Sequence, residues 1–202
     1  MFDLRTCYCN AKASWYTKSP YTYFGRPYFI QTSAIKNQVI KMNKSSEIIN
    51  DFSLLRTQPL SENEKINKLL SHFLYKTPWE ETGLYQALEL QIKNMGGSYK
   101  GLKNLQDITK YYSNIDKMYA STKEFGLNLP DANSGILSKF RTQPMNGIFF
   151  ALDDNGLPYF TGRGSHRLAA SIAANSLKTP GYLIGISKLA LINQTWKKFI
   201  LS

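Results

Sequence analysis

The chain has 202 residues, of which 43% are hydrophobic and 13% aromatic, a composition that supports a packed core and excludes a generally disordered chain. Its 25 Lys and Arg residues exceed its 14 Asp and Glu residues, which gives a formal net charge of +11 at pH 7. A charge of this size favours phosphate-bearing partners, although solubility alone is also a sufficient explanation. The length allows one well-buried domain or two small ones and excludes a large multidomain enzyme.

The cysteine and histidine content argues against two kinds of structural site. Cys7 and Cys9 are the only cysteines, and a pair separated by one residue cannot staple a fold, so we expect free thiols and a cytoplasmic, reducing compartment. His72 and His166 are the only histidines, and no stretch has the ligand spacing of a metal site. The first residues do not have the pattern of a secretory signal, and the longest apolar run, 148–152, is too short to cross a bilayer, so we expect no membrane partner.

Residues 1–60 combine aromatic side chains with turn-forming residues, as in the stretch from Ser19 to Pro27. This mixture predicts an irregular, aromatic-rich arm rather than regular elements. We expect its aromatic side chains to pack on the body of the protein, with stacking on nucleic-acid bases as the functional alternative.

Residues 61–130 carry apolar side chains at helical spacing and predict three consecutive helices. Ser61 and Glu64 have the spacing of a capping box, and Thr77 has the pattern of a second helix cap. His72 and Trp79 lie beside these apolar stripes and are expected to be packing residues. The expected helices run from Ser61 to Leu74, from Thr77 to Met95 and from Asn104 to a stop at Gly126.

Residues 131–202 change to a pattern of short strands and helices, after a turn-rich linker at 130–135. Pro158 indicates a position toward the edge of the sheet, because proline lacks the N–H that a central strand needs. The expected elements are strands at 148–152, 157–160 and 182–186, a turn at 153–156, and helices at 165–174 and around Trp196 at 191–200. The predicted fold class is α+β, with a helical N-terminal half followed by a small mixed sheet with helices, in one compact unit.

The segment from Thr161 to Arg167 joins a predicted strand to a predicted helix through Gly162 and Gly164. A glycine-rich turn at a helix N-terminus lets backbone amides approach an anion. Ser165 is the expected helix cap, and His166 and Arg167 follow in the first turn. The pattern matches neither a Walker loop nor a Rossmann fingerprint. It predicts a phosphate-binding turn formed by Gly162, Arg163, Gly164, Ser165, His166 and Arg167.

Positive side chains in this first turn oppose the helix dipole, so Arg163, His166 and Arg167 are unfavourable there unless an anion binds. The dipole contributes about 0.3–1 kcal/mol, whereas even millimolar binding needs roughly 4 kcal/mol. Useful affinity therefore needs further groups, such as a base pocket or a metal shared with Asp153 or Asp154. The structural alternative is that the two glycines only serve a tight turn and Arg167 pairs with a carboxylate.

These features together resemble a known superfamily. A strand, an Asp-x-x-Gly turn, a second strand, the block Gly-Ser-His-Arg-Leu-Ala-Ala and a further strand are similar to ParB/sulfiredoxin-like proteins, from about Gly147 to Ile186. A group of uncharacterised ParB-like proteins also carries a helical segment before this block, and the likeness then runs from about Ser61 to Trp196. Its further matching residues are His72, Phe73, Trp79, Glu80, Glu81, Thr82, Gly96, Tyr112, Ile115, Asp116 and Tyr119.

The resemblance implies phosphate chemistry with ATP or CTP, and with Mg²⁺ as a possible metal. Members bind and hydrolyse CTP or use ATP as a phosphate donor, and by motif position Gly164, His166 and Arg167 would hold phosphate. Two residues depart from the pattern. Ser165 stands where sulfiredoxins place a reactive cysteine, and Arg163 stands where many relatives have an acid, so Asp153, Asp154 or another acid would have to substitute for it in catalysis beside His166.

Three functional hypotheses remain open at the level of the sequence. The first is a nucleotide- or phosphate-binding protein, as a phosphotransferase or nucleotide hydrolase. The second is a DNA- or RNA-binding module without catalysis, because residues 155–202 contain six basic residues and no acid. The third is an inert interaction protein. Neither the acceptor substrate nor the oligomeric state is encoded in a recognisable pattern.

Overall fold

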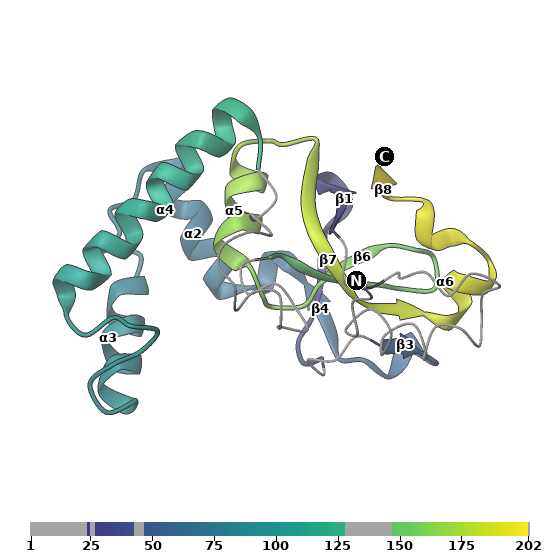
Figure 1. Ribbon diagram of the computed structural model, residues 1–202, viewed down its shortest axis with the longest axis horizontal. Coiled ribbons are helices and arrows are strands. Elements are labelled where there is room, and N and C mark those ends of the chain that lie inside the picture. The colour runs from purple at the N-terminus through teal and green to yellow at the C-terminus, as the bar shows by residue number, and fades with distance from the viewer. Residues whose placement is uncertain (1–23, 25–26, 43–46, 128–146, 202) are drawn as a thin grey trace, which may run out of the picture. The chain divides into compact units, whose positions relative to one another are not determined.

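The computed structural model describes Phe24 and residues 27–42, 47–127 and 147–201 (Figure 1). These residues form two compact units, named here the β unit and the helical unit. The β unit contains the described residues among 1–60, 128–164 and 177–202, and the helical unit contains 61–127 and 165–176. The division corrects the expected grouping of 131–202 with the helices as one compact unit, because the helix at 165 belongs to the helical unit and the strands around it do not.

The β unit is built on a mixed sheet in the order β4-β2-β6-β5-β7-β1-β8, with β3 also paired to β7. The pairs β2–β6, β3–β7 and β5–β7 are parallel, and the remaining pairs are antiparallel. An α+β fold with a mixed sheet is therefore confirmed. The strands are β1 (Pro27–Gln31), β2 (Asn37–Val39), β3 (Glu47–Ile49), β4 (Thr57–Pro59), β5 (Phe149–Leu152), β6 (Pro158–Phe160), β7 (Lys178–Ser187) and β8 (Ile200–Leu201).

Strand β7 is the longest strand and pairs with β1, β3 and β5. Its residues from Thr179 to Ser187 are buried, as expected for a strand covered on both faces. Gly181 makes close packing possible here, because a Cβ atom at that position would lie 2.2 Å from the ring of Phe150. Strand β7, at 178–187, is longer than the strand predicted at 182–186.

The prediction of an irregular arm was wrong for the described part of residues 1–60. Four strands lie between Pro27 and Pro59, and three of them have only three residues. Such short strands have little local signal, since their stability comes from pairing with partners distant in sequence. The hydroxyls of Thr32 and Thr179 share a buried hydrogen bond of 2.8 Å across 147 residues.

Two further predictions about the β unit were wrong. Strand β6 is internal rather than an edge strand, since it pairs with β2 as well as β5; Pro158 is tolerated as its first residue. The region 191–200 is not one helix. It contains the end of α6 (Lys188–Ile192), the 3₁₀ turn η5 (Thr195–Lys197) and the start of β8. The linker at 130–135, Cys7 and Cys9 lie outside the described residues.

The helical unit contains α2 (Glu64–Tyr75), α3 (Leu84–Asn94), α4 (Leu105–Phe125) and α5 (Ser165–Ala173). Helix α4 begins after Asn104 and ends at Gly126, as predicted. Helix α2 is capped by Asn63 rather than Ser61, because the side chain of Asn63 accepts a hydrogen bond from the Ile66 N–H. The expected helical half is not N-terminal, since β1 to β4 precede it.

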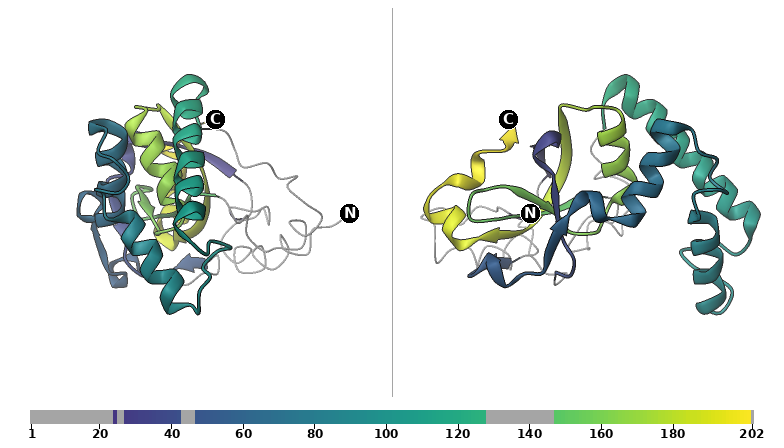
Figure 2. Two further views of the ribbon diagram at one scale, coloured as in Figure 1. Left: turned by 90° about the vertical axis from the view of Figure 1, so that its left-hand side faces the viewer. Right: turned by 180° about the vertical axis from the view of Figure 1, so that it is seen from behind.

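Aromatic rings fill the space between α2, α3 and α4 in the helical unit. Trp79, buried as predicted, contacts Phe73 and Tyr112, and Tyr112 stacks on Tyr85 at 5.1 Å between ring centroids. Helix α5 packs against both α2 and α4 (Figure 2). None of the described helices is long and apolar enough to cross a bilayer.

Candidate functional site

The loop at 161–164 is held by the start of strand β5 in the β unit. The N–H and the hydroxyl of Thr161 each donate to the Phe149 carbonyl at 3.0 Å, and the Phe149 N–H donates to the Arg163 carbonyl at 3.2 Å. The guanidinium of Arg163 lies 4.7 Å from the centroid of the Phe149 ring. The predicted loop is therefore a fixed extension of the β5–β6 hairpin.

Gly162 and Gly164 both have a φ of +87°, a conformation that favours glycine. Their surroundings differ. A Cβ atom at Gly164 would lie 2.6 Å from the Gly147 carbonyl oxygen and 2.7 Å from the Ile148 Cα, whereas one at Gly162 would meet nothing within 4 Å. Gly164 thus lets two backbone segments approach closely, and Gly162 leaves an open position in the loop.

The first turn of α5 belongs to the helical unit and contains the remaining predicted residues. Ser165 is buried and is the first residue of the helix rather than the residue that precedes it. His166 and Arg167 follow and are partly buried, and no acidic side chain lies in this turn. Ser165 therefore does not occupy the cap position that its type predicted.

His166 is a neutral histidine with an unused nitrogen. Burial, together with the positive charges of Lys65 and Lys100, lowers the pKa of His166 from 6.5 to about 3. Its Nε2 atom is buried and has no hydrogen-bond partner within the described structure. The rings of Tyr111 and Tyr112 face the imidazole edge-on, at 5.7 and 6.2 Å between centroids. At neutral pH His166 is therefore uncharged, whereas the sequence analysis treated it as a positive side chain in this turn.

Asp153 and Asp154 lie in the turn between β5 and β6, at the end of the hairpin opposite the 161–164 loop. One carboxylate oxygen of Asp153 accepts from the N–H groups of Asn155 (2.9 Å) and Leu157 (2.8 Å), while burial raises the pKa of Asp153. The carboxylate of Asp154 accepts from the Ser187 hydroxyl. Strands of three or four residues separate the two ends by about 10 Å or more. The structure does not bring these acids to the glycine loop.

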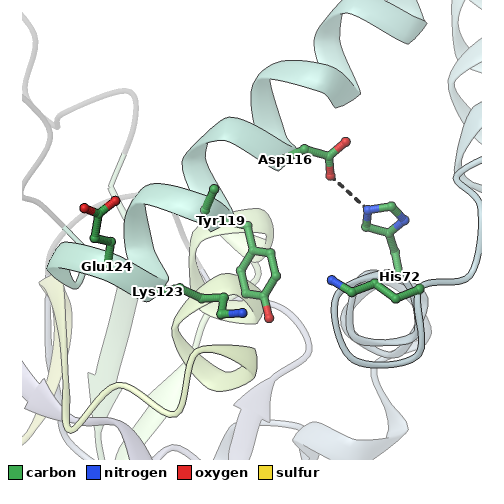
Figure 3. A pocket seen from close by; sticks show the side chains of 7 residues that line it. His72, Asp116, Tyr119, Lys123 and Glu124 are labelled. Carbon is green, nitrogen blue, oxygen red and sulfur yellow. Dashed lines mark hydrogen bonds and ion pairs between the residues drawn. The ribbon is translucent and has the colours of Figure 1, made fainter.

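A second histidine cluster of the helical unit was not predicted as a site. The His72 ring faces oxygen atoms with both nitrogens: Nδ1 lies 2.7 Å from the Thr77 carbonyl and Nε2 lies 2.9 Å from Asp116 Oδ1 (Figure 3). The Trp79 indole donates to Asp116 Oδ2 at 3.0 Å and stacks on His72 at 3.6 Å. Because Asp116 lies 44 residues from His72, no local pattern connects the two.

An open pocket of about 500 Å³ adjoins this cluster. In Figure 3 the Tyr119 ring lies between the end of α2 and the last turns of α4. Both nitrogens of His72 already have oxygen partners within the protein, so the ring is held in place by the fold. The residues that line the pocket are His72, Lys76, Asp116, Tyr119, Ala120, Lys123 and Glu124.

Within the described part of the chain, no three His, Cys, Asp or Glu side chains are grouped so that they could hold a metal ion. Comparisons with known proteins add no assignment. No family model, curated protein or solved structure matches this chain. What the candidate site can bind therefore follows from its own residues.

Proposed function

We propose that the first turn of α5 binds a phosphate group, and that the protein is a nucleotide-binding member of the ParB/sulfiredoxin-like superfamily. The buried Nε2 atom of His166, which has no hydrogen-bond partner among the residues that the structure describes, carries this proposal. Buried polar atoms in folded proteins nearly always have a partner, so an unpaired one points to a ligand or a water molecule. A phosphate oxygen is a suitable partner at a helix N-terminus, where backbone N–H groups also favour an anion.

The roles of the neighbouring residues follow from their chemistry. A neutral imidazole has one N–H, so His166 donates to the phosphate from Nε2 in one of its two tautomers. Arg167 offers a planar guanidinium, which suits phosphate oxygens. Gly162 and Gly164 precede this turn in the chain, and both have a φ of +87°. The residue set is that of phosphate binding by positioning and charge rather than by covalent catalysis.

Turnover by a phosphotransferase or nucleotide hydrolase would use ATP or CTP, commonly with Mg²⁺. The first turn of α5 supplies no carboxylate as a magnesium ligand, and Asp153 and Asp154 are engaged in their own turn. The described residues therefore do not fit a resident Mg²⁺ here, and the proposal includes no metal-dependent step.

A thermal-shift panel tests the proposal. ATP, CTP and AMP, each with and without magnesium, are added to the wild type, to Arg167→Ala and to His166→Ala. We expect a nucleotide-dependent rise in Tm for the wild type, because a ligand that binds only the folded state stabilises it. Both variants should lose this rise. Arg56→Ala is the matched control, since it removes an exposed arginine elsewhere in the chain.

Two outcomes contradict the proposal. Either no nucleotide shifts the wild-type Tm, or the two variants keep the full shift. If Arg167→Ala does not fold, Arg167→Lys retains the charge but loses the bidentate geometry, and a weakened shift in that variant gives the same answer.

A nucleic-acid-binding function is the second candidate, and a set of lysine–aromatic pairs in the β unit favours it. Lys178 lies 4.5 Å from the Phe29 ring centroid, and Lys198 lies 5.4 Å from that of Phe199. Positive charge beside aromatic rings is typical of surfaces that bind single strands.

Binding to a single-stranded oligonucleotide should then weaken with salt, and log K should fall against log salt with a slope of about −0.7 per phosphate contact. Lys178→Met with Lys198→Met should reduce that slope, and a salt-independent affinity would contradict this candidate.

A further inference from the structure

The open pocket beside His72 lies wholly within the helical unit, between the end of α2 and the last turns of α4. The residues of α4 that line it recur mainly at a spacing of three or four residues, which places them on one side of the helix. They include Asp116, Tyr119, Ala120 and Lys123. On the other side of the pocket, His72 and Lys76 come from the end of α2.

Two lysines, one from each helix, lie over the ring of Tyr119 in this pocket. The distance from the ammonium nitrogen to the ring centroid is 5.7 Å for Lys76 and 5.9 Å for Lys123. In Figure 3 the side chain of Lys123 extends toward this ring. The ring itself stacks on buried Phe73 at 4.3 Å between centroids, so it is anchored in the core. The pocket thus has a fixed aromatic wall with two positive charges beside it.

The acids of the pocket do not pair with these lysines. Within the described part of the chain, neither Lys76 nor Lys123 forms an ion pair. The carboxylate of Asp116 already accepts from the Trp79 indole at 3.0 Å and lies 2.9 Å from the His72 ring. The carboxylate of Glu124 points away from the Tyr119 ring (Figure 3). The two ammonium groups are therefore available to a negatively charged partner.

Lys76 stands at a position where the backbone favours glycine. It ends α2 with a left-handed φ of 61°, and its N–H donates to the His72 carbonyl at 3.0 Å. The helix dipole favours a cation at this end, and the same side chain reaches the pocket. Lys76→Gly therefore removes the ammonium group while it suits the backbone, which makes it a variant that should fold.

The open shape of the pocket indicates the kind of occupant. Small-molecule sites bury most of their ligand, which an open pocket does not do. Tyr75, three residues after His72 and on the same side of α2, is 79% exposed and extends the aromatic surface. Exposed tyrosine is enriched where proteins bind one another, and complementary charge guides the partner. These features favour a segment of a larger molecule with negative charge.

We propose that the pocket between α2 and α4 docks an acidic segment of a partner protein, whose carboxylates pair with Lys76 and Lys123. A nucleic acid fits less well, because Phe73 stacks on the Tyr119 ring and two ammonium groups lie over it, whereas a base needs a free ring face. The proposal is independent of the phosphate site at α5.

An NMR titration of the full chain tests this docking site. The probes are N-acetylated hexaglutamate, N-acetylated hexaglutamine, free glutarate and a single-stranded hexathymidylate. We expect hexaglutamate to shift the backbone signals of residues 72–76 and 116–124 in a saturable way. Hexaglutamine should cause no shift there, because it lacks the charge. Glutarate and hexathymidylate should bind these residues at least tenfold more weakly than hexaglutamate.

Variants connect the binding to the two lysines. Lys76→Gly and Lys123→Met should each weaken hexaglutamate binding about fivefold, the loss expected for one exposed ion pair, and the double variant should lose it. Lys110→Met removes an exposed lysine of the same helix more than three turns before Lys123 and should leave the affinity unchanged. Arg167→Ala should also leave it unchanged, which separates this site from the one at α5.

Four results would overturn the inference. They are no saturable shift with hexaglutamate, shifts spread over the whole chain, an equal loss of affinity in Lys110→Met, and tighter binding of glutarate or hexathymidylate to the same residues. The last result would assign the pocket to a small carboxylate or to a nucleic acid instead.

Discussion

The two histidines of the helical unit have opposite surroundings. Both lie among aromatic rings, His72 against Trp79 and His166 against Tyr111. The ring of His72 faces a carboxylate and a carbonyl, so both of its nitrogens have partners. Burial and the positive charges of Lys65 and Lys100 lower the pKa of His166, and among the described residues its buried Nε2 atom has no hydrogen-bond partner.

This difference separates the structural role of His72 from the ligand contact that is proposed for His166. Oxygen atoms lie within hydrogen-bond distance of both nitrogens of His72, and its contact with Asp116 joins α2 to α4. The positive surroundings of His166 favour its neutral ring and an external anion. A histidine whose hydrogen bonds are complete stabilises the fold, whereas one left incomplete in a positive field is the better candidate for a ligand contact.

The largest effect is expected from Asp116→Ala. The substitution removes the acceptor of both the His72 ring and the Trp79 indole. Loss of two charge-assisted hydrogen bonds to a carboxylate whose side chain is 44% exposed should cost about 3 kcal/mol in the free energy of unfolding, measured by urea denaturation. Glu124→Gln, on the same helix and pocket, should change it by less than about 0.5 kcal/mol. Equal effects of the two variants would remove the structural role given to His72.

The glycine pair before α5 provides the second comparison. Gly162→Ala and Gly164→Ala introduce the same strain, because both residues have a φ of +87°. Only Gly164→Ala also meets backbone atoms, at 2.6 and 2.7 Å, so it should be less stable than Gly162→Ala by about 1–3 kcal/mol. Thermal unfolding of both variants measures the difference. Similar Tm values would contradict the close approach of Gly164 to Gly147 and Ile148.

The low pKa of His166 predicts a loss of stability in acid. In the unfolded chain the residue takes up a proton near its ordinary pKa of 6.5, whereas in the folded protein it does so only near 3. Its contribution is therefore present above pH 6.5 and is lost as the pH falls toward 3, by about 2 kcal/mol between pH 7 and pH 5. Urea denaturation at both pH values should show a smaller loss for His166→Gln. Identical losses would argue against a buried neutral ring.

The smallest effect is expected from Tyr119→Phe in the pocket beside His72. The Tyr119 hydroxyl donates to the Phe73 carbonyl at 3.5 Å, a long and weak hydrogen bond, while the ring stacks on Phe73 at 4.3 Å. Removing the hydroxyl should change the free energy of unfolding by less than about 0.5 kcal/mol, whereas Tyr119→Ala should cost several times more. A large effect of Tyr119→Phe would show that the pocket depends on the hydroxyl.

Sequence reasoning succeeded where the signal was local. The start of α4 near Asn104 and its stop at Gly126 are properties of neighbouring residues, and both were predicted correctly. It failed for the short strands between Pro27 and Pro59, because their pairing partners are distant in the chain. The loop from Gly162 and the helix at Ser165 were also located from local pattern. The effect of Lys65 and Lys100 on the pKa of His166 was not predicted, because nothing links these residues in sequence.

The amino-acid sequence by itself determined the helices of residues 61–127, the hairpin at 149–160 and the position of the glycine turn before α5. These features depend on side-chain periodicity, caps and glycine conformations within a few residues. Tertiary structure alone decided that the His72 ring contacts Asp116 at hydrogen-bond distance. It also decided that burial and the charges of Lys65 and Lys100 lower the pKa of His166. Electrostatic energy and hydrogen bonding depend on distances in space, and folding sets those distances between residues that the chain keeps far apart.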